Sequence, residues 1–262
     1  MGLQLLFASG KRPSRLAIKE FAEARCTVSI SHDPLDTSPH LVANEGERVG
    51  TAPVAEPDID ERQWLELLRD GLTFDLMGLA PGEACERADI QHSFDFGQSP
   101  GALRLEALRL VPGKHLSGGG NSIPVVRTML AIACDMVQHF DDLEAVVWKP
   151  IASVMSRRYF ESIVSAWLEG GPFPAMGLTT IHETGDGALQ SVGLEFWIGQ
   201  ELRIEPHLLG DKAEAAQLAS RLINRLVIDG PLDRSERVTA PDLSKLVLQP
   251  SQNGRFIRVF RE

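Results

Sequence analysis

The pattern of apolar and polar positions predicts short strands alternating with amphipathic helices along most of the chain. Apolar or alternating runs predict strands at 3–8, 26–31, 72–77, 92–96, 102–111, 143–148, 176–182, 189–197, 202–204, 245–248 and 256–260. Apolar residues at helical spacing, together with start and stop signals, predict helices near 13–24, 62–69, 122–137, 153–168 and 211–230.

The stretch from Leu143 to Glu205 has the most legible order of elements. A buried strand is followed by a helix, and then by Gly170–Pro174, which neither a helix nor a central strand accepts. Two strand-like runs follow, joined across Gly185–Gly187. This stretch therefore predicts a strand, a helix and a hairpin.

The order of elements predicts an α+β protein with a mixed or antiparallel sheet and helices packed on it. In each half the order resembles a split β-α-β, ferredoxin-like arrangement. We therefore expect an N-terminal half at 1–142 and a C-terminal half at 143–262, with one continuous domain as the alternative. Residues 32–60 contain four prolines and few large apolar residues, which predicts a long loop.

Composition and charge narrow the classes of function. The 262 residues are 43% hydrophobic and 24% charged, as in ordinary globular proteins, and the net charge is −10. An acidic chain disfavours a broad contact with nucleic acid. No apolar run is long enough to span a bilayer, and three dispersed cysteines without paired spacing are typical of a reducing compartment, so we expect a cytoplasmic protein.

A glycine-rich loop before the predicted helix at 122–137 is the first candidate site. Exposed N–H groups at a helix N-terminus favour anions, and nearby side chains could add contacts. The alternative is a flexible connection with an ordinary helix cap. The candidate ligand-binding residues are His115, Ser117, Gly118, Gly119, Gly120, Asn121 and Arg127.

A group of polar residues around Gln200 is the second candidate site. Strand alternation places Glu195 on the same face as Trp197 if the run at 189–197 is regular, and Glu201 follows directly after Gln200. Paired carboxylates can perform acid–base chemistry when their environments separate their pKa values. The alternative is that these acids are partly solvated and blunt a sheet edge.

Most motifs that would indicate a particular chemistry are absent from the sequence. The seven histidines are dispersed without H-x-x-x-H spacing, so we expect no metal site, and no cofactor motif of the G-x-G-x-x-G type occurs. There is no G-x-S-x-G sequence and no complete Walker A motif. Whether the chain is an enzyme stays open at this point.

Part of the chain resembles a bacterial family of domains of unknown function numbered 4261. The resemblance rests on Ala145–Pro150, the helix through Phe160, Gly193–Phe196 and Gln200–Leu202, and it covers about Leu143 to Val227. It implies a bacterial, cytoplasmic α+β protein and supplies no reaction and no catalytic residues.

These observations together favour a non-catalytic protein-interaction module. An acidic surface suits a basic partner, and exposed sheet edges suit a protein partner or a homo-oligomer. The alternative is a protein or enzyme that binds a small anionic ligand at residues 118–121.

Overall fold

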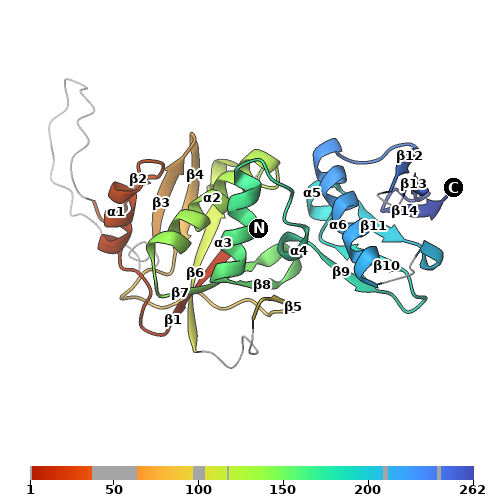
Figure 1. The fold of residues 1–262 in the computed structure, drawn as a ribbon. Helices are drawn as coiled ribbons and strands as arrows, with labels where there is room; N and C mark the ends of the chain where they lie inside the picture. The colour runs from red at the N-terminus through yellow and green to blue at the C-terminus, as the bar shows by residue number, and fades with distance from the viewer. Residues whose placement is uncertain (1, 37–63, 97–103, 117, 209–211, 241–242) are drawn as a thin grey trace, which may run out of the picture.

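The computed structural model describes residues 2–36, 64–96, 104–116, 118–208, 212–240 and 243–262. In these ranges the chain forms an α+β protein with two mixed, mostly antiparallel sheets and six α-helices (Figure 1). The predicted class of fold is therefore confirmed. None of the helices in these ranges combines the length and the apolar composition needed to cross a bilayer.

The first sheet has eight strands in the order β2-β3-β4-β6-β1-β7-β8-β5. Its strands are β1 (Leu3–Ala8), β2 (Ser29–His32), β3 (Trp64–Arg69), β4 (Leu72–Met77), β5 (His92–Phe94), β6 (Leu105–Pro112), β7 (Leu143–Trp148) and β8 (Ser153–Ser156). β1 lies in the interior of this sheet, where its apolar residues are buried on both faces, as the sequence predicts.

β6, α2 and β7 form a split β-α-β unit. β1 is antiparallel to both β6 and β7, so those two strands are parallel to each other with β1 between them. However, the sheets have eight and six strands, and they are not two four-stranded ferredoxin-like halves. The order of elements along the chain does not determine how many strands join each sheet, because strand pairing depends on long-range contacts.

Helices cover one face of the first sheet, and an irregular segment covers part of the other. α1 (Arg15–Ala24), α2 (Ile123–His139) and α3 (Arg157–Leu168) bury apolar side chains in the main core. On the opposite face, residues 85–96 pack on Leu6 and Val147. The buried Gln4 amide holds this segment, because it donates to Glu86 O at 2.6 Å and accepts from Ala88 N at 2.9 Å.

The second sheet has six strands in the order β12-β13-β14-β11-β10-β9. Its strands are β9 (Thr180–Glu183), β10 (Leu189–Val192), β11 (Glu201–Ile204), β12 (Glu236–Thr239), β13 (Lys245–Pro250) and β14 (Phe256–Arg261). The helices α4 (Ala175–Leu178), α5 (Glu195–Ile198) and α6 (Lys212–Asp229) belong to this part of the chain. α6 contacts β10 and β11, and the main core cluster includes residues of both sheets.

The helix predicted at 62–69 is wrong, because residues 64–69 form β3. Trp64, Leu67 and Leu68 have helical spacing, but the chain buries the alternating pair Leu65 and Leu67 as a strand does. A tight Asp70–Gly71 turn, with positive φ at both residues, joins β3 to β4. Asp-Gly between apolar runs is a strong hairpin signal, in agreement with this turn.

Several other predicted boundaries shift in the structure. The predicted helix at 153–168 begins as β8 and becomes helical only after Ser156, whose hydroxyl caps α3. The predicted strand at 189–197 ends at Val192, because the positive φ of Gly193 turns the chain into α5. The predicted strands at 26–31 and 176–182 begin later, as β2 and β9, while β12 was not predicted.

The expected boundary after residue 142 falls between α2 and β7, inside the elements of the first sheet. The chain passes to the second sheet between β8 and β9. Of the loop expected at 32–60, residues 37–60 lie outside the described residues.

Candidate functional site

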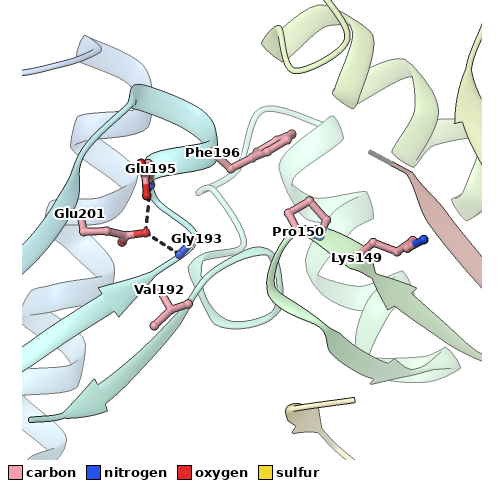
Figure 2. Close-up of a pocket in the computed structure, with 7 residues that line it drawn as sticks. All are labelled: Lys149, Pro150, Val192, Gly193, Glu195, Phe196 and Glu201. Carbon is pink, nitrogen blue, oxygen red and sulfur yellow. Dashed lines mark hydrogen bonds between the residues drawn. The ribbon is translucent and has the colours of Figure 1, made fainter. Parts of the chain in front are cut away.

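An open cavity of about 590 Å³ lies between the two sheets and is the candidate site (Figure 2). Residues from both parts of the chain line it. They are Lys149, Pro150, Val192, Gly193, Glu195, Phe196 and Glu201. We call this cavity the inter-sheet groove.

The wall on the side of the first sheet is the turn that follows β7. The short 3-10 helix η4 (Lys149–Ile151) carries Pro150 in its first turn, and Ala152 in a left-handed conformation leads into β8. The buried Trp148 anchors this turn across the sheets, because its Nε1 donates to Leu178 O at 3.0 Å. The turn is thus fixed by a hydrogen bond to the segment that leads into the second sheet.

Aromatic rings connect the two walls of the inter-sheet groove. Trp148 lies 5.3 Å from Phe196 and 5.8 Å from Trp197, measured between ring centroids. Trp197 in turn contacts Phe173 and Trp167. These ring contacts pack the two walls against each other beside the groove.

The wall on the side of the second sheet depends on Gly193. Its φ is +93°, and an added Cβ would lie 2.1 Å from Ile151 Cγ2. The backbone of this wall therefore approaches the first sheet more closely than a side chain would allow.

The Glu201 carboxylate fixes the conformation of residues 193–195. It accepts from the backbone N–H groups of Gly193 at 2.7 Å, Glu195 at 3.1 Å and Leu194 at 3.2 Å, and from the Ser191 hydroxyl. Consecutive backbone N–H groups of this kind form an anion-binding nest. Here the chain fills the nest with its own carboxylate, so Glu201 has a structural role.

The other residues of the second candidate set differ in position. The Gln200 amide is buried, donates to Leu232 O and Gly254 O at 3.1 Å each, and accepts from Leu232 N at 2.7 Å. Glu195 is exposed at the rim of the groove and does not share a strand face with Trp197, because both lie on α5. The structure thus brings Glu195 and Glu201 together, but in an arrangement that strand alternation does not predict.

The inter-sheet groove combines apolar surface with charged side chains. Pro150, Val192 and Phe196 supply apolar surface, and the Lys149 side chain extends away from the second sheet in Figure 2. The charged residues of the lining are Lys149, Glu195 and Glu201. An apolar groove with a carboxylate at its rim suits an apolar group with a positive charge nearby.

The glycine-rich loop lies directly before α2. Gly118, Gly119 and Asn121 are exposed, and Ser122 occupies the N-cap position of α2 without a side-chain capping bond. Pro124 lies in the first turn of α2, where its missing N–H costs no helix hydrogen bond.

Arg127 is turned toward α3 and does not join the loop. It donates to Leu168 O at 2.9 Å and its guanidinium lies 4.6 Å from the Trp167 ring centroid. Ser117 lies outside the described residues. Of the described residues of the predicted set, Gly118 to Asn121 are consecutive in the loop, whereas Arg127 contacts α3.

His115 lies near a buried carboxyl group that sequence reasoning missed. Asp75 on β4 is 7% exposed, and burial raises its pKa above the usual range, with a further increase from Glu66. A hydrogen bond from Trp64 and the positive charges of Lys114 and His115 act in the opposite direction. Glu66 on β3 lies opposite Asp75 on β4. This pairing would have indicated the site, but it could not be inferred from the sequence because residues 62–69 were predicted to form a helix.

Comparisons with known proteins add no relative. No family model, no curated protein and no solved structure matches this chain. Among the described residues, no group of three His, Cys, Asp or Glu side chains is placed to hold a metal ion.

Proposed function

We propose that this chain is a non-catalytic protein-interaction module whose inter-sheet groove receives an apolar side chain of a partner protein. The observation that carries the proposal is the composition of the groove. Its apolar surface comes from Pro150 on one wall and from Val192 and Phe196 on the other. Glu195 is exposed at the rim.

Interfaces between proteins support this reading. A few apolar anchor residues that enter pockets contribute most of the binding energy, and the surrounding polar rim adds specificity. The net charge of −10 and the position of Glu195 favour a basic partner. We also propose a cytoplasmic location, and the resemblance of Leu143–Val227 to the family numbered 4261 stays part of this proposal.

Native mass spectrometry of the protein purified gently from its own cells tests the proposal. We expect a co-purifying basic protein or a discrete homo-oligomer. Glu195→Lys should reduce the bound fraction about tenfold, because it places a repulsive charge at the rim. The matched control is Glu20→Lys, since Glu20 is exposed on α1 of the first sheet and does not line the groove.

Other outcomes would overturn the proposal. A clean monomer without a partner would contradict it, as would equal losses from both substitutions. An added mass of a few hundred daltons would instead favour the alternative prediction of a small bound ligand, and Gly118→Pro would then test the loop at 118–121.

A further inference from the structure

We propose a second interaction surface, the groove between α1 and β2, which binds an extended basic segment of a partner protein as an added β-strand. This inference goes beyond the inter-sheet groove and rests on different residues. We call this surface the edge groove.

The edge groove lies beside a strand with an unpaired side. β2 is a terminal strand of the first sheet and, among the described strands, it pairs only with β3. A terminal strand presents a row of backbone N–H and C=O groups without a strand partner. Extended peptides bind such edges through main-chain hydrogen bonds, and adjacent pockets select their side chains.

A cavity of about 450 Å³ accompanies this edge and supplies such a pocket. Its lining combines the residues from Val28 to Asp33, and Asp36, with Lys19, Ala22 and Glu23 of α1. Figure 1 shows α1 next to β2 at one end of the first sheet. A helix and an edge strand therefore enclose one groove, which is the geometry needed to hold an added strand.

The side chains indicate which segment fits. Val28 is 3% exposed, while Ile30 and Ala22 are half-buried, so the base of the groove is apolar. The pairing of β2 with β3 shifts register between Ile30 and His32, and we expect the added strand to pair on the Val28 side of that shift. An alternating segment would place every second side chain on this apolar base.

The charge of the rim favours a basic segment. Asp33 is paired with Lys19 at 2.8 Å and with Arg15, so the positive charge of Lys19 is balanced within the described lining of the groove. Glu23 is exposed at the rim, and no ion pair of Glu23 occurs among the described contacts. Together with a net charge of −10, this carboxylate favours a partner segment that carries lysine or arginine in addition to its apolar residues.

Binding of a labelled peptide in which lysine and valine alternate tests the inference by fluorescence anisotropy. We expect Glu23→Lys to raise the Kd about tenfold or more. Glu20→Lys carries the same charge change on the same helix outside the groove, and should change the Kd less than about twofold at physiological salt. Glu195→Lys should leave this Kd unchanged, which separates this surface from the inter-sheet groove.

N-methylated peptides test the added strand itself. Methylation of every second amide removes the N–H groups from one edge of an extended peptide. We expect one methylated set to abolish binding and the complementary set to leave it intact, because only one edge faces β2. Hydrogen exchange of the β2 amides should slow in the complex.

Four results would overturn the inference. They are equal binding of both methylated sets, equal binding of a glutamate–valine peptide, and no binding of the basic peptide up to about 1 mM. The fourth is a homodimer of the protein alone that Glu23→Lys dissociates, because the occupant of the edge groove would then be a second copy of this chain.

Discussion

Asp75 shows how a single residue can make stability depend on pH. Its carboxyl group is buried between β3 and β6, next to Glu66, and the charges that favour its ionised form come from Lys114 and His115. Burial is the largest effect and raises its pKa above the ordinary value of 3.8. The folded protein therefore holds this proton more tightly than the unfolded chain does.

This shift predicts the sign of a pH dependence. The stability from protonated Asp75 is fully present below the unfolded pKa and is lost as pH rises through the raised folded pKa. Asp75→Asn cannot ionise, so it removes the loss of stability at higher pH. Its amide oxygen can still accept the hydrogen bond from Trp64. We expect the free energy of unfolding of the variant, relative to wild type, to increase as pH rises above about 4.

Urea denaturation from pH 3.5 to 8 measures this difference. The control is Asp70→Asn, because Asp70 is exposed in the β3–β4 turn and tolerates a left-handed conformation as asparagine does. A difference between Asp75→Asn and wild type that stays constant with pH would contradict the prediction.

At the scale of elements, one carboxylate holds the short helix α5 in place. Glu201 on β11 binds three successive N–H groups of residues 193–195, so a strand residue fixes the turn that forms a wall of the inter-sheet groove. A four-residue helix has little stability of its own, and its position depends on such contacts.

Replacing this acceptor tests its role. Glu201→Gln puts an amide NH₂ group where a carboxylate oxygen accepts N–H bonds, and we expect a loss of about 2 kcal/mol in the free energy of unfolding. Glu195→Gln makes the same chemical change at an exposed neighbour and should cost less than about 0.5 kcal/mol. If chemical denaturation shows equal losses for Glu201→Gln and Glu195→Gln, the hydrogen bonds to Glu201 do not stabilise the folded protein as proposed.

The elements that the sequence predicts well are those with local signals. β1, β4 and β7 are mostly apolar runs, and Asn253–Gly254 marks the hairpin between β13 and β14. β3 was predicted as a helix because Trp64, Leu67 and Leu68 also fit the helical period, and only its pairing with β2 and β4 settles the choice. Glu195 and Glu201 could be identified from the sequence as candidate site residues. Lys149 and Pro150, which line the same groove, could not.

At the scale of the whole molecule, the two sheets meet through close contacts that bring residues far apart in sequence into one site. The backbone of Gly193 packs on Ile151, and Trp148 donates to Leu178 O. No local pattern encodes these approaches, so the inter-sheet groove becomes visible only when the sheets are placed together. The same contacts make the groove part of the folded core.

Gly193→Ala should therefore disturb the junction of the sheets. Its positive φ costs about 1 to 2 kcal/mol for alanine, and the clash with Ile151 adds about 1 to 3 kcal/mol. Gly187→Ala has a similar φ of +81°, but its added Cβ would lie 3.9 Å from the nearest atom, so only the first cost applies. Thermal or urea unfolding of both variants checks this, and equal losses would contradict the proposed clash.

The interior position of β1 also has a consequence during synthesis. β1 lies between β6 and β7, and β7 ends only at Trp148. At about 5 to 20 residues per second, roughly 7 to 30 s separate the appearance of β1 from that of its last neighbour. β6 is complete at Pro112, so until β7 follows, one edge of the apolar strand β1 has no strand neighbour and Leu3–Ala8 is a target for ribosome-associated chaperones.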